Sequence, residues 1–379
     1  MRRLLLAWVP LLVVCVLLEV MLQTTHLFHA RLSWTEPDRM IGWRFTPGRE
    51  YWFFAENDHA ITGRINSMGW RDRERTVRKP AGTYRIAVVG DSFVEAFQVE
   101  PESTFVARAE ERLNRERPES TDITYEVMNF GRSGMSPAEE MMVLERDVMP
   151  CDPDAVVLLF TPQNDIADID PSTTTDSCRP FFHQAGLDSL SLDTSFAHRR
   201  DFWIRELINP FKQHSALVSL VSERYNAWRL MRARARSAPA AAPDLTREQD
   251  MCTAHPDEPF TRNYGLCKLL ITRMARDAAA RGVRFELASV PLVYEDQVVE
   301  RLRLIDPSFD PGFFDRDLAV MADSSGFGFV PLTAAFAATA RATGNRLHWQ
   351  HWNYEGHREA AEVLFLVPWP SAREPSASH

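Results

Sequence analysis

The stretch "VVGDSFVEAF", from Val88 to Phe97, ends a buried apolar strand in Gly-Asp-Ser and then becomes amphipathic. Similar apolar strands recur at residues 85–90, 123–130, 154–160, 283–290 and 327–332. Segments with helical periodicity fall between and after them, at residues 104–115, 137–148, 269–282 and 354–367. This alternation predicts an α/β fold, with a parallel sheet that is covered by helices on both faces.

Length and charge limit the class of protein. A chain of 379 residues suits one large α/β domain with additions, or two domains. Its formal net charge of -9 argues against a nucleic-acid partner, since such proteins normally carry a basic face.

The first residues resemble a membrane anchor. Arg2 and Arg3 precede an apolar run from Leu4 to Leu22 in which Glu19 is the one charge. The run is long enough to span a bilayer, and the arginines favour a cytoplasmic N-terminus. We therefore expect residues 1–23 to form a single-pass anchor in the cytoplasmic membrane, with the remainder extracytoplasmic or periplasmic. A cleaved signal peptide is the alternative.

The rest of the chain divides by composition. Residues 24–80 are dense in aromatics and predict a small β-rich extension, followed by the α/β domain at 81–368 and a disordered tail at 369–379. An irregular, lid-like insert is expected at 166–260, including a low-complexity surface loop at 231–244. Four arginines in or beside that loop either belong to a solvated surface, the favoured interpretation, or attract an anionic substrate: Arg229, Arg232, Arg234 and Arg236.

The cysteines permit disulfides if the chain lies in an oxidising compartment. Cys151, Cys178, Cys252 and Cys267 all follow the predicted anchor. Four cysteines allow three pairings, and we expect a bond between Cys252 and Cys267, which are close in sequence. Buried thiols are the alternative.

Polar residues gather where the predicted strands end. "GDSF" begins at Gly90, "NFGRSG" spans Asn129–Gly134, "TPQND" spans Thr161–Asp165, and "HWQHWNYEGH" spans His348–His357, at the last helix. In parallel sheets these ends meet at one edge, where ligands bind.

Ester cleavage is the chemistry that these residues suit. Ser92 would be the nucleophile and His351 its general base. The oxyanion would be stabilised by the backbone N–H groups of Ser92 and Gly134 and by the side-chain amide of Asn164.

These four blocks resemble the SGNH hydrolases, also called GDSL-type esterases and lipases. "INSMGWRD", Ile65–Asp72, further resembles a segment of membrane-anchored bacterial members. The resemblance implies a three-layer α/β/α domain with a flavodoxin-like parallel sheet of about five strands, and the same roles for Ser92, Gly134, Asn164 and His351. It also implies a substrate that is an acyl ester, above all an O-acetyl group on an extracytoplasmic glycan, and no cofactor.

The final block departs from the family pattern. The family has an Asp two or three residues before the histidine, where this chain has Trp349 and His348. His348, a backbone carbonyl or a distant acid such as Glu355 could orient His351 instead. Without the Asp, the chain could also be a non-catalytic surface or assembly protein. If the serine is active, it could equally serve an acyltransferase, and the substrate could be a lipid ester.

A metal site is not expected. His348, His351 and His357 have spacing that resembles metal ligands, but Asn353 and Gly356 fit the esterase pattern.

Overall fold

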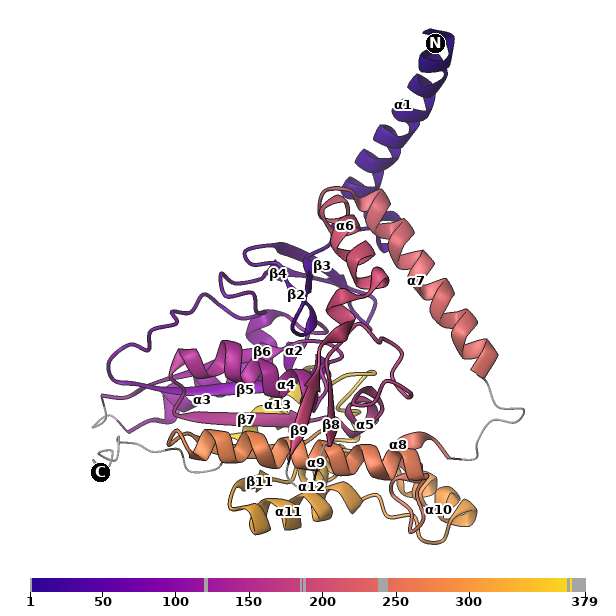
Figure 1. Ribbon diagram of the computed structural model, residues 1–379. Helices are drawn as coiled ribbons and strands as arrows, with labels where there is room; N and C mark the ends of the chain where they lie inside the picture. The colour runs from indigo at the N-terminus through magenta and orange to yellow at the C-terminus, as the bar shows by residue number, and fades with distance from the viewer. Residues whose placement is uncertain are drawn as a thin grey trace.

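A computed structural model describes residues 2–118, 122–184, 186, 189–237, 245–366 and 369. At its centre is a five-stranded, wholly parallel sheet with the order β11-β10-β7-β5-β6 (Figure 1). Its strands are β5 (Thr83–Gly90), β6 (Thr124–Gly131), β7 (Ala155–Phe160), β10 (Arg284–Ser289) and β11 (Gly328–Val330). In chain order this is the 2-1-3-4-5 arrangement of flavodoxin-like sheets, whose switch point lies between the first and third strands, here β5 and β7. The predicted α/β class and parallel sheet are confirmed.

Helices cover both faces of this sheet. One face packs against α3 (Phe105–Glu116), α12 (Thr333–Thr343) and α13 (Tyr354–Leu364). The other packs against α4 (Pro137–Val143), α9 (Glu258–Ala279) and α11 (Phe313–Ser325). A π-turn at Leu144–Val148 continues α4, and α10 (Asp296–Ile305) precedes α11.

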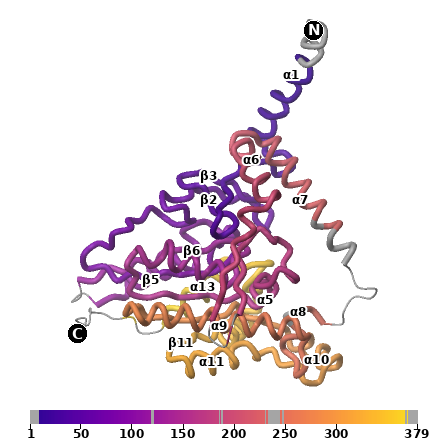
Figure 2. Tube along the Cα trace, viewed as in Figure 1, coloured from indigo at the N-terminus to yellow at the C-terminus, as the bar shows by residue number. Residues whose placement is uncertain are grey.

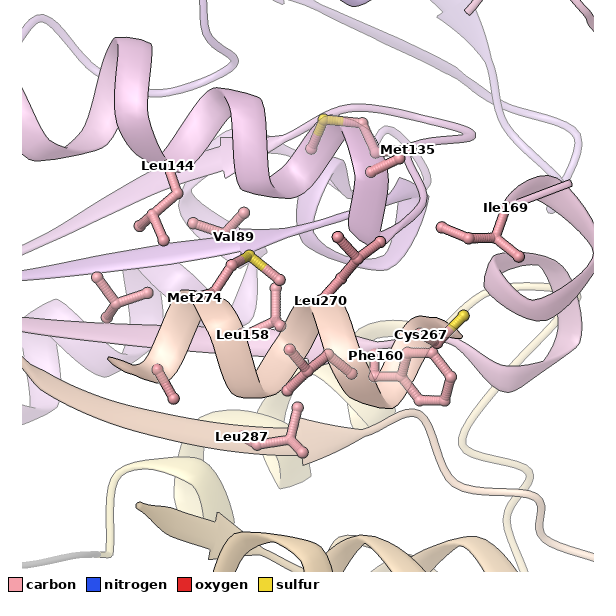
Figure 3. Close-up of a cluster of buried hydrophobic side chains, with 14 of the residues drawn as sticks. Val89, Met135, Leu144, Leu158, Phe160, Ile169, Cys267, Leu270, Met274 and Leu287 are labelled. Carbon is pink, nitrogen blue, oxygen red and sulfur yellow. The ribbon is translucent and has the colours of Figure 1, made fainter. Parts of the chain in front are cut away.

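Alternation along the strands separates the two cores. Val88 of β5 belongs to the cluster on the α3 side, whereas its neighbour Val89 faces α9. Figure 3 shows Val89, Leu158 and Leu287 of the sheet beside Leu270 and Met274 of α9. Each such side chain contributes roughly 1.5–3 kcal/mol by leaving water.

The N-terminal extension, predicted only to be β-rich, contains two hairpins. β1 (Thr35–Asp38) pairs with β2 (Gly42–Phe45), and β3 (Glu50–Phe54) pairs with β4 (Ala60–Arg64). Their aromatic core includes Trp34, Phe45 and Tyr51, and it encloses Phe97 from the α/β domain. The extension therefore shares its core with the segment that follows Ser92.

The predicted irregular insert is mostly regular. Its start overlaps the short helix α5 (Pro162–Asp168). A β-hairpin follows, formed by β8 (Phe181–Gln184) and β9 (Leu190–Asp193). The helices α6 (Arg200–His214), α7 (Ala216–Ser237) and α8 (Arg247–Asp250) come next. The loop predicted at 231–244 is helical as far as Ser237, because its alanines and arginines are strong helix formers. Residues 238–244 lie outside the described residues, as do the side chains of Arg234 and Arg236.

The predicted membrane anchor requires correction. Residues Arg2–Thr25 form helix α1, which projects from the rest of the molecule and meets α7 at its base (Figure 2). Among the described residues, no helix combines the length and the apolar character needed to cross a bilayer. This finding overturns the anchor at residues 1–23 and the single-pass membrane location inferred from it.

Helix α1 instead makes polar contacts near its end. Glu19 accepts hydrogen bonds from Ser215 Oγ at 2.6 Å, from the amide of Ala216 at 2.6 Å and from the amide of Leu217 at 3.1 Å. The carboxylate thus binds the unpaired amides that begin α7. Burial disfavours the charged form of Glu19, but these hydrogen bonds lower its pKa overall.

The predicted disulfide is absent, because all five cysteines are thiols. Cys267 lies in α9, where its Sγ is 3.8 Å from the carbonyl oxygen of Asp165. Of the predicted tail, Trp369 is buried against Phe365 and Tyr84, and residues 370–379 lie outside the described residues.

Candidate active site

Ser92 lies at the carboxyl end of β5, as its position in the sequence predicts. It begins the short helix α2 (Ser92–Glu95), and Asp91 caps that helix by accepting a hydrogen bond from the amide of Phe93 at 3.0 Å. The turn closes with Ala96 in the left-handed region, at φ +59°. The serine hydroxyl is thereby held at the switch point between β5 and β7.

His351 lies within hydrogen-bonding distance of the serine. Its Nε2 is 2.8 Å from Ser92 Oγ, and its ring lies 4.9 Å from that of Phe93, centroid to centroid. The expected pairing of Ser92 with His351 is therefore present in the structure.

The acid beside His351 is Glu56, which sequence reasoning missed. Glu56 Oε1 is 2.6 Å from His351 Nδ1, and Oε2 accepts from the amides of Gln350 at 2.8 Å and of His351 at 2.9 Å. Burial opposes ionisation of Glu56, but its hydrogen bonds to His351 outweigh that effect and lower its pKa. Glu56 is thus a carboxylate that orients both the ring and the backbone of the histidine.

Glu56 comes from the β3–β4 hairpin of the extension, 36 residues before Ser92. The sequence offers one signal for it. The missing acid at position 348 indicates that another segment must supply a carboxylate, but only the tertiary structure shows which one.

The residues that the sequence suggested as partners of His351 lie elsewhere. His348 pairs through its backbone with Trp352, and its ring makes no hydrogen bond to His351 within the described residues. Burial, together with Arg346, lowers the pKa of His348. The carboxylate of Glu355 accepts a hydrogen bond from the guanidinium of Arg358.

Asn164 and Gly134, the residues predicted as oxyanion donors, are each held by hydrogen bonds. Asn164 Nδ2 donates to Asp91 Oδ2 at 2.7 Å, which leaves the second hydrogen of that amide for another acceptor. Gly134 has φ +71°, a conformation that favours glycine, and its carbonyl accepts from Arg179. Within the described residues its N–H makes no hydrogen bond.

The loop that carries Gly134 is fixed against α2. The amide of Arg132 donates to the carbonyl of Gly90 at 3.2 Å, and the amide of Ser133 donates to Glu95 Oε2 at 3.0 Å. Burial raises the pKa of Glu95 to about 8, although the nearby cations Arg71 and Arg132 act to lower it. The loop that carries Gly134 and the turn that carries Ser92 therefore hold each other in place.

The segment "INSMGWRD" connects the extension to the same turn. Arg71 is 3% exposed and donates to the carbonyls of Glu95 and Ala96 at 2.9 Å each, to that of Val99 at 2.6 Å and to the hydroxyl of Tyr51 at 2.9 Å. This contact gives the segment a physical role that its sequence does not disclose.

His357 lies apart from the site, as a structural residue. It is buried, and its Nδ1 accepts from the amide of Phe105 at 3.3 Å. Burial lowers its pKa to about 3 and keeps the ring neutral. In the part of the chain that the structure describes, no cluster of three or more His, Cys, Asp or Glu is placed to hold a metal ion.

A cavity of about 940 Å³ lies next to the segments that carry Ser92 and His351, although neither of these two residues is among its lining residues. Phe93 and Gln163, next in sequence to Ser92 and Asn164, line it together with Tyr294, His348 and Gln350. Its walls combine apolar and hydrogen-bonding side chains, as ligand sites do.

Comparisons with known proteins give structural likeness only. No protein-family model matches the chain, and no curated protein matches it. Among solved structures, the chain is similar to Axe2, an acetylxylan esterase from Geobacillus stearothermophilus, with 14% identity, coverage of 77% of this chain and 97% of that one, and a TM-score of 0.40. LAE5, an alpha/beta hydrolase from the metagenome of Lake Arreo, Spain, has 14% identity over 76% of this chain and 96% of its own, with a TM-score of 0.36.

Proposed function

We propose that this protein is a serine esterase in which Ser92, His351 and Glu56 form the catalytic triad. The observation that carries the proposal is the continuous line of short contacts, 2.8 Å from Ser92 Oγ to His351 Nε2 and 2.6 Å from His351 Nδ1 to Glu56 Oε1. With Nδ1 donating to the carboxylate, Nε2 carries a lone pair toward the serine hydroxyl.

The reaction proceeds in two halves. Ser92 Oγ attacks the ester carbonyl carbon while His351 Nε2 takes the hydroxyl proton, and Glu56 stabilises the imidazolium that results. The tetrahedral intermediate collapses, and His351 returns the proton to the departing alcohol. Water then attacks the acyl-serine by the same route, releasing the carboxylic acid and restoring Ser92.

The oxyanion is stabilised by three donors on this chain. They are the backbone N–H groups of Ser92 and Gly134 and the second amide hydrogen of Asn164. Support comes from the position of Ser92 as the first residue of α2, the positive φ of Gly134, and the hydrogen bond to Asp91 that fixes the Asn164 amide. Donors of this kind each contribute about 3–4 kcal/mol to transition-state stabilisation.

The proposed substrate is an acyl ester, above all an O-acetyl group on a glycan. The cavity lined by Phe93 and Gln350, the sequence neighbours of Ser92 and His351, supports a substrate with a substantial alcohol part, since about 940 Å³ far exceeds the size of an acetyl group. The hypothesis of a non-catalytic protein depended mainly on the missing acid before His351. The contact between Glu56 and His351 weakens that hypothesis.

Two esters test the proposal. The full chain should hydrolyse a chromogenic acetyl ester and release acetate from an acetylated oligosaccharide, whereas His351→Ala should do neither. Folding of the variant is checked by circular dichroism. A wild type that turns over neither ester would refute the esterase. Turnover of the chromogenic ester alone would refute the glycan substrate.

A further inference from the structure

A second cavity, of about 960 Å³, is lined by residues of helices α6 and α7, of the β1–β2 hairpin and of the segment 175–177. Figure 1 shows α6 and α7 as neighbouring helices. Ser92, His351 and Glu56 are not among its lining residues. We propose that this cavity binds a carboxylate-bearing saccharide, at a site separate from the catalytic serine.

The acidic side chains of the cavity are already neutralised. Three carboxylates line it, and each forms an ion pair: Glu36 with Arg44 at 2.7 Å, Asp176 with Arg205 at 2.8 Å, and Asp201 with Arg199 at 2.6 Å. They therefore offer little charge to a cationic ligand.

Three cations of the cavity lack such partners. No carboxylate of the described residues lies within 4.0 Å of the charged groups of Lys212, Arg229 or Arg232. Lys212 is half-buried, and burial lowers its pKa although Glu223 opposes the shift. A partly desolvated ammonium with no ion-pair partner, on the walls of a cavity that also holds Arg229 and Arg232, favours an anionic ligand.

The other lining groups specify more than an anion. Trp43, Tyr225 and Trp228 present aromatic rings, and the guanidinium of Arg232 lies 4.7 Å from the Trp228 ring centroid. Asn209 and Asn226 add neutral amides to the same walls. Flat apolar surfaces combined with amides and cations match a ligand that has a planar hydrocarbon face, hydroxyl groups and carboxylates, which is the chemistry of an acidic sugar.

Direct binding to the full chain tests this site without reference to catalysis. Isothermal titration calorimetry would compare an oligogalacturonate with a neutral xylo-oligosaccharide of equal length. We expect the oligogalacturonate to bind and the neutral sugar not to. Lys212→Met and Arg229→Met should each raise Kd about tenfold, since each removes one charge-assisted contact. Trp228→Ala should weaken binding similarly.

Matched controls come from two exposed positions of helix α6 that do not line the cavity. Arg200→Met and Trp203→Ala remove an exposed cation and an exposed indole of α6, and both should leave Kd unchanged. Melting temperatures of all five variants show whether each is folded. Equal binding of the neutral sugar, equal losses in the controls, or a wild type that does not bind oligogalacturonate would overturn the proposal. Binding of inorganic sulfate as tight as that of the sugar would reduce the site to a simple anion site and also overturn it.

Discussion

Replacing Glu56 by glutamine should lower turnover by about a thousandfold. The substitution keeps the size of the side chain and removes the charge that faces the imidazolium in the transition state. With charge centres roughly 4 Å apart and an effective dielectric constant near 20, that attraction is about 4 kcal/mol. Each 1.36 kcal/mol corresponds to about a factor of ten in rate, which gives about three orders of magnitude.

The glutamine amide can also change which ring nitrogen of His351 carries the proton. A glutamine can turn its NH₂ group toward Nδ1, which would leave the ring proton on Nε2, facing Ser92. The histidine could then no longer accept the serine proton. The loss should therefore appear in kcat, with KM little changed, because Glu56 touches the histidine and not the substrate.

The assay is the steady-state hydrolysis of a chromogenic acetyl ester by purified, folded protein. Glu50→Gln is the matched control, since Glu50 is an exposed acid of the same hairpin. It should retain wild-type kcat. A folded Glu56→Gln variant with kcat within about threefold of wild type would refute the assignment of Glu56 as the triad acid.

Further substitutions separate positioning from chemistry. Arg71→Met should cost about 3–5 kcal/mol of unfolding free energy, measured in urea, because it strands three buried carbonyls and the Tyr51 hydroxyl; a loss below about 1 kcal/mol would contradict the clamp. His348→Ala should change kcat by less than about tenfold, since His348 does not orient His351; a loss as large as that of Glu56→Gln would reverse the two roles. His357 titrates near 6.5 when unfolded and at about 3 when folded, so the unfolded chain binds its proton first as pH falls. Wild type should therefore lose up to about 5 kcal/mol of stability between pH 6.5 and 3 through this group, and His357→Gln should remove that part of the slope; an unchanged slope would show that His357 is not buried as a neutral ring.

Local patterns were sufficient to predict the sheet and to assign most of the proposed site residues to one edge of it. Each strand of the parallel sheet is a short apolar run, and the polar residues after it fall at the edge that all parallel strands share. Ser92, Asn164 and Gly134 could be placed in this way because each follows its strand directly. His351 could be placed because it lies just before the last helix of the alternation.

Glu56 and Arg71 could not be found by the same reasoning. Both lie in a segment whose pairing with the α/β domain depends on Phe97 packing among the aromatics of the extension, a contact between residues far apart in sequence. The end of helix α7 was predicted to be a loop for a local reason, not because of a long-range contact. Its alanines and arginines lack apolar spacing, and helix propensity without periodicity resembles a loop.

The predicted anchor shows the limit of hydropathy. Its apolar run does form a helix, but Glu19 within that run caps α7, and composition alone does not reveal this contact.

The central claim, that Ser92 is a nucleophile activated by His351 and Glu56, is tested most directly by covalent labelling with a fluorophosphonate. The site of the adduct is located by peptide mass spectrometry. Wild type should carry the adduct on Ser92, Ser92→Ala should not be labelled, and Glu56→Gln should be labelled far more slowly. Circular dichroism should show that Ser92→Ala is folded, because removing a hydroxyl at the site leaves no large core cavity. An adduct on another residue, or labelling of Ser92→Ala at the wild-type rate, would contradict the account.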